Sequence, residues 1–188
     1  MRVITGRYKG RTIRTVNDLS VRPATDRVRV TIFNMLEHRI NFAGIRVLDL
    51  FAGSGSLGIE ALSRGAASTT FVEQQHQAAL FLEENLRLLG CLAQSGIAEM
   101  DALSYCTVER TTYDLVFADP PYAYARTEEV PAVVFGGGLV RPGGYLVMEH
   151  AHHLHFAAGA AWDAGPEKKF GRTLVTFFRP KQIGSSAS

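Results

Sequence analysis

Apolar residues recur along the chain with two different periods, and the two alternate from about residue 45 onward. Short apolar runs predict strands, whereas apolar positions at three- and four-residue steps predict helices. The predicted strands are Ile45–Leu50, Ser68–Glu73, Ile97–Met100, Tyr113–Ala118, Tyr145–Glu149, Phe156–Ala161 and Arg172–Phe178. The predicted helices run from about Arg27 to Ile40, Ser56 to Arg64, Gln75 to Leu89 and Glu128 to Phe135. This alternation predicts an α/β fold with a doubly wound, mostly parallel, seven-stranded sheet.

The two ends of the chain depart from this alternation. Residues 1–16 resemble a short hairpin in which Val3, Ile13 and Val16 point inward. Asp26 or Thr25 is expected to cap the first helix. We therefore expect an N-terminal arm over residues 1–25, one domain over residues 26–182 and a disordered tail over residues 183–188.

Positive charge is concentrated in the arm and the first helix. The first 40 residues hold nine Arg or Lys and three acidic residues, a net charge of +6, whereas the whole chain carries +2. A basic arm on a mildly acidic body is typical of a protein with a polyanionic partner, although a solvated basic surface would look the same. The candidate RNA contacts are Arg7, Lys9, Arg11, Arg22, Arg27 and Arg29.

A glycine-rich turn joins the first predicted strand to the next helix. The stretch VLDLFAGSGSLG spans residues 47–58 and contains Gly53, Gly55 and Gly58. Glycines in a strand–turn–helix unit allow a tight turn and a close approach to a ligand. Glu73 ends the next strand about 20 residues later, the spacing expected for a carboxylate that binds ribose hydroxyls. A nucleoside-bearing cofactor is therefore expected.

Acidic residues end four of the predicted strands, namely Asp49, Glu73, Asp101 and Asp119. Ligands of open α/β sheets bind beyond the carboxyl ends of the strands. We therefore expect these four side chains to lie along one edge of a single crevice.

The sequence Asp119-Pro120-Pro121-Tyr122 follows the fourth strand directly. The prolines force the chain into an extended loop and have no N–H groups, so carbonyl and carboxylate oxygens dominate the loop. An exocyclic amine of a nucleobase has two donors for such acceptors, and Tyr122 offers a face on which the base can stack. A strand-ending turn with a buried tyrosine is the structural alternative.

Together these motifs resemble one enzyme family. RPATDRVRVTIFNML, DLFAGSGSLGIEALSRGA, FVE and DPPY are similar to the bacterial small-subunit ribosomal RNA guanine-N2 methyltransferases, the RsmD family. The resemblance runs from ITGRYKGR in the arm to GRTLVTFFRP near the end of the chain. It implies a Rossmann-like class I methyltransferase fold, S-adenosylmethionine as cofactor and S-adenosylhomocysteine as product.

The resemblance also implies roles for particular residues. Asp49 and the loop over residues 51–58 would hold the methionine part of the cofactor, Glu73 the ribose, and Asp101 with Ala102 the adenine. The loop residues concerned are Phe51, Ala52, Gly53, Ser54, Gly55 and Gly58. Asp119–Tyr122 would grip a flipped guanine, since a stacked amine cannot reach the methyl group. The arm would bind the RNA backbone.

The resemblance further implies a cytoplasmic monomer that methylates one guanine of 16S rRNA in an assembled or assembling small subunit. The chain departs from the family pattern at two positions, because Ala24 and Val30 stand where Thr and an acid are expected. The missing acid at Val30 puts in doubt any role of that position in orienting Arg27 or Arg29.

Three other functions compete with this interpretation. A nicotinamide-dependent oxidoreductase would explain the glycines and Glu73, but it has no use for Asp119–Tyr122. A DNA adenine or cytosine amino-methyltransferase shares the DPPY sequence, but it usually carries an added target-recognition region, and no shift in composition marks one. An RNA-binding assembly factor without catalysis would not need the intact carboxylates.

Composition adds few further candidates. Cys91 and Cys106 are expected to be packing residues in a reducing cytoplasm. The histidines at positions 150, 152, 153 and 155 suggest a metal site, but no cysteine or carboxylate pair completes a ligand set at the usual spacing. We therefore expect no metal. No apolar run is long enough to span a membrane.

Overall fold

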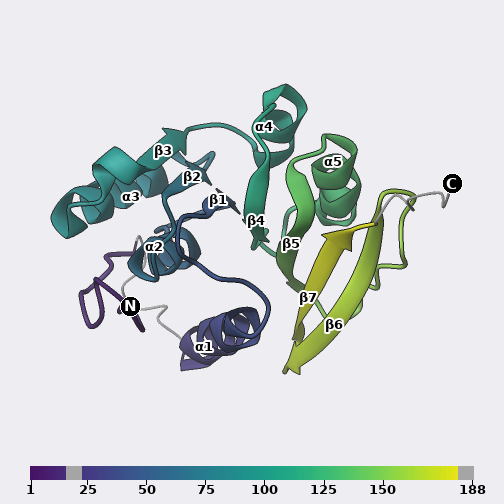
Figure 1. The fold of residues 1–188 in the computed structure, drawn as a ribbon, viewed down its shortest axis with the longest axis horizontal. Helices are drawn as coiled ribbons and strands as arrows, with labels where there is room; N and C mark the ends of the chain where they lie inside the picture. The colour runs from purple at the N-terminus through teal and green to yellow at the C-terminus, as the bar shows by residue number, and fades with distance from the viewer. Residues whose placement is uncertain (16–22, 182–188) are drawn as a thin grey trace, which may run out of the picture.

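A seven-stranded sheet forms the centre of the molecule (Figure 1). The computed structural model describes residues 1–15 and 23–181. The strand order is β3-β2-β1-β4-β5-β7-β6, and β7 runs antiparallel to both of its neighbours. The strands are β1 (Arg46–Leu50), β2 (Ser68–Val72), β3 (Ser95–Ala98), β4 (Tyr113–Ala118), β5 (Val140–Ala151), β6 (Trp162–Phe170) and β7 (Thr173–Pro180). This arrangement confirms the predicted doubly wound, mostly parallel α/β fold.

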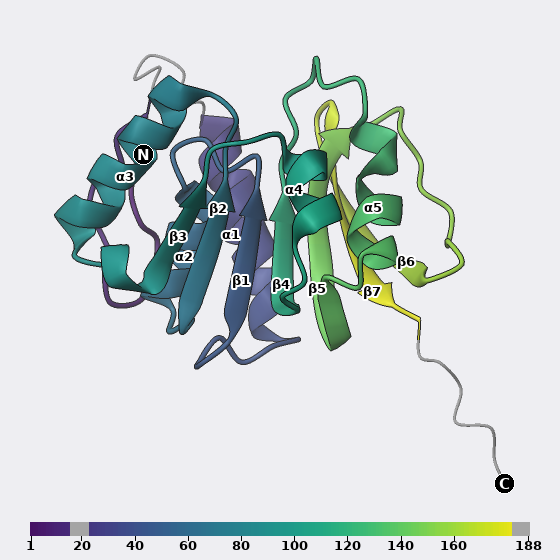
Figure 2. The same ribbon diagram turned by 90° about the horizontal axis from the view of Figure 1, so that it is seen from above.

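Helices cover both faces of the sheet (Figures 1 and 2). They are α1 (Pro23–Glu37), α2 (Ser56–Ser63), α3 (His76–Leu89), α4 (Ala102–Val108) and α5 (Val130–Gly136), with short 3-10 turns at Leu92–Gln94 and Thr127–Glu129. The first three helices share one hydrophobic core with the sheet, and α4 and α5 share a second core on the opposite face. None of the described helices is both long enough and apolar enough to cross a bilayer.

Most predicted elements are found within a few residues of their expected bounds, and the exceptions have local causes. The helix α4 was not predicted; it is only seven residues long, and Asp101 caps it by accepting a hydrogen bond from the Ser104 N–H. The strand predicted at 156–161 is wrong, because β6 begins at Trp162 and forms a hairpin with β7. The first helix begins at Pro23, where proline suits the first turn of a helix.

The N-terminal arm packs against the domain. Its predicted hairpin is reduced to one isolated bridge between Arg2 and Thr12. Val3, Tyr8 and Ile13 are buried in the same core as α1 and α2, as predicted for Val3 and Ile13. Val16 lies outside the described residues. The buried apolar side chains therefore hold the arm in place, and the polar residues between them face outward.

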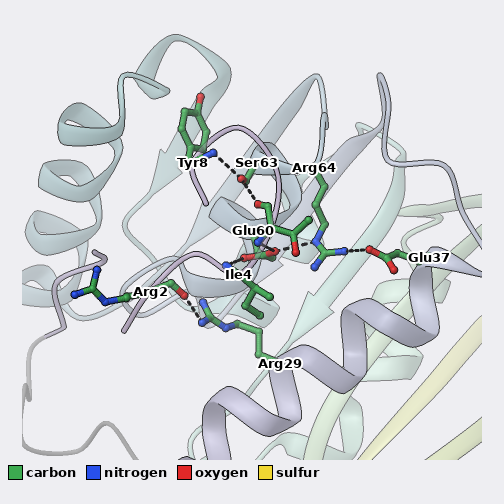
Figure 3. Close-up of polar contacts among 9 residues, drawn as sticks. Arg2, Ile4, Tyr8, Arg29, Glu37, Glu60, Ser63 and Arg64 are labelled. Atoms are coloured by element: carbon green, nitrogen blue, oxygen red, sulfur yellow. Dashed lines mark hydrogen bonds and ion pairs between the residues drawn. The ribbon is translucent and has the colours of Figure 1, made fainter. Parts of the chain in front are cut away.

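A buried carboxylate on α2 anchors the arm by its backbone (Figure 3). The two carboxylate oxygens of Glu60 accept hydrogen bonds from the N–H groups of Ile4, at 2.7 Å, and Thr5, at 3.0 Å. The Arg64 side chain balances this charge, donating from Nε to Glu60 at 2.9 Å and pairing outward with Glu37. Because Glu60 is fully buried, each of these donors satisfies a charge that water cannot reach.

Arg29 of α1 completes this polar cluster. The guanidinium of Arg29 donates to the Arg2 carbonyl and to Asp26, the latter at 3.0 Å, and only 4% of Arg29 is exposed. Burial lowers the pKa of Arg29, against the opposing effect of Asp26. The sequence placed Arg29 off the buried stripe of its helix and among the RNA contacts. The structure corrects this, because Arg29 lies on the buried face and binds the arm internally. Asp26 supplies the acidic partner that was expected at position 30.

We expect Glu60→Ala to release the arm, because the change leaves two N–H groups and Arg64 without their partner. The loss in free energy of unfolding should be about 3 kcal/mol, measured by urea denaturation. Glu37→Ala is the matched control, since it removes only the outer, half-exposed partner of Arg64 and should cost less than about 1 kcal/mol. Equal losses in the two variants would contradict the anchoring role of Glu60.

Candidate active site and cofactor cavity

The glycine-rich turn is held at the end of β1 by a buried carboxylate. Asp49 is 2% exposed, and its Oδ2 accepts the Gly58 N–H at 2.8 Å. Gly55 precedes α2 with φ at 81°, a conformation that favours glycine. Gly58 lies against β2, where an added Cβ would come within 2.3 Å of the Phe71 ring. Asp49 therefore positions the turn, and it is not among the residues that line the cavities at this edge of the sheet.

A second carboxylate fixes the start of the turn from the neighbouring strand. Glu73 follows β2 and accepts the Gly53 N–H and the Gln75 N–H, each at 2.8 Å. Phe51, which precedes Ala52 of the turn, has a φ of 60°, a backbone conformation that residues other than glycine rarely adopt. Its ring packs edge-on against Tyr124 with centroids 4.8 Å apart. Such strained residues gather at functional sites.

Two cavities open at this edge of the sheet. The first, of about 440 Å³, lies over the glycine turn and is lined by Phe51, Gly53, Ser54, Glu73, Met100 and Ala102, among others. The second, of about 220 Å³, lies toward β7 and is lined by Tyr124, Glu128, His153, Leu154 and Thr173, among others. Both are lined by Asp119, Pro120, Pro121, Tyr122 and Glu149. The Asp119–Tyr122 segment and Glu149 therefore form the boundary between two neighbouring cavities.

Negative groups gather at this boundary. Burial raises the pKa of Asp49 to about 8, helped by the charges of Asp119 and Glu73 and opposed by the Gly58 N–H. The surrounding protein raises the pKa of Asp119 to about 6, even though its side chain is accessible from the cavities. Burial and the charge of Asp119 raise the pKa of Glu149 to about 8. Within residues 1–15 and 23–181, no ion pair joins any of these carboxylates to a cation.

Asp101 has a structural task that the sequence did not suggest. Its carboxylate accepts the N–H of Ser104 at 2.8 Å and the hydroxyl of Tyr124 at 2.9 Å. Burial disfavours its charged form, but these hydrogen bonds outweigh burial and lower the pKa of Asp101. Asp101 is not among the residues that line the first cavity, whereas its neighbours Met100 and Ala102 are. The predicted contact of Asp101 with an adenine amine stays a prediction.

Tyr122 projects into solvent beside the second cavity. Its side chain is 77% exposed, and its hydroxyl shares a 2.6 Å hydrogen bond with Thr173. That bond fixes the position of the phenol ring beside the two cavities. The buried-tyrosine alternative is wrong, and an exposed ring is available for stacking.

Sequence reasoning missed two parts of this site. Glu149 ends the fifth predicted strand, just as the other four acids end theirs, but it was not among the predicted site residues. Thr15 of the arm lines the first cavity. Asn85 of α3 places this segment, because its side chain bonds both the N–H and the carbonyl of Arg14 and donates to the Ser54 carbonyl at 3.1 Å. No periodicity in the sequence indicates that contact.

The basic residues expected to contact RNA divide into three groups. Arg7, Lys9, Arg11 and Arg27 are exposed. Arg29 is buried as described above, and Arg22 lies outside the described residues. Arg11 also donates to the Leu88 carbonyl at 2.9 Å, which leaves part of its guanidinium free.

The histidines and cysteines do not form a site. His150 is buried and bonds Thr176 at 2.8 Å, whereas His152 turns outward to the Arg172 carbonyl. In the described part of the chain, no three His, Cys, Asp or Glu side chains converge as a metal ion would require. Cys91 and Cys106 are free and buried, which confirms their interpretation as packing residues.

Comparison with known proteins agrees with this architecture. The family described as conserved hypothetical protein 95 matches residues 1–179. Ribosomal RNA small subunit methyltransferase D of Escherichia coli K12 is 32% identical over 99% of this chain and 93% of its own. The protein of the same name from Haemophilus influenzae is 32% identical over 91% and 89%. The solved structure of yhhF from Escherichia coli has 30% identity and a TM-score of 0.85, covering 96% of this chain and 98% of that one.

The chain belongs to the RsmD methyltransferase family. This confirms the resemblance stated from the motifs. It also gives the first cavity its chemistry, because the cofactor of this fold, S-adenosylmethionine, carries a positive sulfonium and a positive ammonium group. The RsmD-type chain offers these charges Glu73 and Asp119 at the cavity wall and Asp49 behind the turn. Carboxylates without protein cations fit the sulfonium and ammonium groups of this ligand, so the residues present suit this cofactor.

Replacing Asp49 by Asn tests this electrostatic fit. An acid whose pKa is higher in the folded protein than in the unfolded chain binds extra protons when folded, so its contribution to stability falls as pH rises from about 4 to about 8. Asp49→Asn keeps an acceptor for Gly58 but cannot ionise. The free variant should therefore lose less Tm than the wild type between pH 5 and 8.

Above about pH 8, where the Asp49 carboxyl group is ionised, the same variant should bind S-adenosylmethionine about tenfold more weakly than the wild type, because it removes an attractive charge near the cation. S-adenosylhomocysteine has no sulfonium charge and should lose less affinity. Calorimetric titration of both ligands measures this difference. Identical losses for the two ligands would contradict a role for the charge of Asp49.

Proposed function

We propose that this protein transfers a methyl group from S-adenosylmethionine to the exocyclic N2 amine of a guanine in small-subunit ribosomal RNA. The observation that carries the proposal is the boundary between the two cavities. Asp119, Pro120, Pro121 and Tyr122 line both, so a base held in the second cavity would present its amine toward the first. Related proteins named ribosomal RNA small subunit methyltransferase D support the choice of RNA.

The boundary suits an amine. An exocyclic amine has two N–H donors, and the loop offers it the Asp119 carboxylate and the proline carbonyls. Hydrogen bonds to these acceptors would leave the nitrogen lone pair facing the first cavity. The exposed ring of Tyr122 would support the base by stacking.

The chain's own residues need only position the amine and accept a proton. The cofactor supplies a methyl group that is already activated by the positive sulfur. When bound, it would give its methyl carbon to the amine nitrogen and keep the electron pair of the broken carbon–sulfur bond on sulfur. The amine then loses one proton, for which Asp119, with its pKa of about 6, is a suitable acceptor near neutral pH. Positioning and exclusion of water supply the remaining rate enhancement.

A stacked guanine cannot enter a cavity of this kind, so the target nucleotide must turn out of its helix or lie in an unpaired loop. The exposed basic residues of the arm would hold the flanking phosphates. Phosphate contacts place the RNA without reading its sequence. The choice of one guanine would therefore depend on RNA shape and on the neighbouring ribosomal proteins.

Methyl transfer from labelled cofactor tests the proposal. The substrates are small ribosomal subunits from cells that lack this enzyme, naked small-subunit RNA and duplex DNA, followed by nucleoside analysis. Label in N2-methylguanosine is the expected result, with subunits and naked RNA compared for rate. Label on DNA adenine or cytosine, or no transfer despite bound cofactor, would contradict it.

Asp119→Ala should lower the transfer rate by at least about 100-fold, since the amine loses both its orienting acceptor and its proton acceptor. The affinity for S-adenosylhomocysteine should stay within about threefold of the wild type, as measured by calorimetry. Wild-type turnover by this variant would exclude the assigned role.

Neutralising Arg7, Lys9 and Arg11 together to Gln should weaken RNA binding and reduce the slope of log affinity against log salt by about 2 to 3. The control is a triple variant of exposed residues elsewhere, Arg110, Lys168 and Lys169, with the same change in net charge. Filter binding between 50 and 300 mM salt measures both. An equal loss of slope in the two variants would mean that only net charge matters.

A further inference from the structure

The boundary between the cavities holds a second carboxyl group that methyl transfer itself does not require. In the parallel pairing of β4 with β5, Met148 lies beside Ala118, so the residues that follow them, Glu149 and Asp119, are neighbours at the sheet edge. Adjacent strands are about 4.8 Å apart. Glu149 lines both cavities, as Asp119 does. A ligand group that contacts Asp119 is therefore within reach of Glu149.

Glu149 has no evident structural task. Its carboxyl group makes no hydrogen bond or ion pair with the part of the chain that the structure describes, and the residue is half-buried. Its oxygens are accessible from the cavities, so a bound group can supply the missing hydrogen-bond partner. Its neighbour His150 is committed to Thr176, and the other titratable groups around the second cavity are Asp119, Tyr122, Tyr124, Glu128 and His153.

The edge of guanine beside the amine gives Glu149 a partner. Guanine presents the N2 amine, then the N1–H donor, then the O6 acceptor. If Asp119 and the prolines take the amine, N1–H is left in the same cavity and needs an acceptor. Burial and the charge of Asp119 keep a proton on Glu149 up to about pH 8, and a protonated carboxyl group has one acceptor and one donor. The acceptor can pair with N1–H and the donor with O6.

We propose that Glu149 reads the base: its carboxyl group accepts the N1–H of guanine and donates to O6 while Asp119 holds the N2 amine. This inference rests on the proposed function, and it assigns selection and reaction to two neighbouring carboxyl groups. Adenine has a bare N1 and an N6 amine in place of N1–H and O6, so it would pair with the carboxyl group only in the reversed orientation, and it has no 2-amine for Asp119 to hold.

The nucleobase 2-aminopurine isolates this contact, since it keeps the N2 amine but has no N1–H and no O6. The experiment compares methyl transfer to small-subunit RNA that carries either guanine or 2-aminopurine at the methylated position, introduced by ligation of a synthetic segment. The enzymes are the wild type, Glu149→Met, Glu149→Ala and Glu149→Gln, each with its Tm and its affinity for S-adenosylhomocysteine measured first.

The wild type should prefer guanine. Glu149→Met should lose about 10- to 100-fold in kcat/KM on guanine, the range for a lost hydrogen bond to a buried polar group, and several-fold less on 2-aminopurine, whose bare N1 can take at most one hydrogen bond from the carboxyl group. Glu149→Gln should keep the preference for guanine, because its amide has the same donor and acceptor as the protonated acid. Glu149→Ala should behave as Met does, and it replaces Met in the comparison if the longer side chain disturbs the fold.

Two results would overturn the inference. One is a guanine preference in Glu149→Met or Glu149→Ala equal to that of the wild type. The other is an equal loss on both bases, which a structural role would produce. Failure of the proposed function is distinguishable, because the wild type would then place no methyl group on guanine N2.

Discussion

Carboxyl groups that share one sheet edge without a protein cation set the main physical constraint on this molecule. Asp49, Glu73, Asp119 and Glu149 lie at the carboxyl ends of β1, β2, β4 and β5, and three of them have raised pKa values. Such an edge costs folding free energy when it is empty, because the charges repel and are poorly solvated. It becomes favourable only when cations or N–H donors occupy it. The rest of the fold holds these groups together in spite of that cost.

Backbone N–H groups reduce part of this electrostatic cost and at the same time shape the site. Asp49 and Glu73 each accept hydrogen bonds from the glycine turn, so these two acids determine the course of the loop. Asp119 and Glu149 have no such partners in the described chain. Their acceptors therefore remain available to ligands, and under the proposed function the methyl transfer would take place at the boundary of the two cavities.

The arm is tied to the same centre through its backbone. Glu60 holds its first residues, and Asn85 ties its far end to the Ser54 carbonyl in the glycine turn. The side chain of Asn85 thus bridges the arm and the glycine turn. A displaced arm would alter the wall of the first cavity at Thr15.

The sequence by itself determined most of the elements and the place of the candidate site, because periodicity, glycines and prolines act locally. The turn at Gly53–Gly58, the strand before Asp119 and the acids at strand ends were all readable without coordinates. Only the tertiary structure decided which polar groups face ligands. Asp101 became a helix cap, Arg29 became an internal anchor, and Glu149 proved to adjoin Asp119. Those outcomes depend on pairing between strands and on packing of the arm against α1 and α2, which are contacts between residues far apart in the chain that no local pattern specifies.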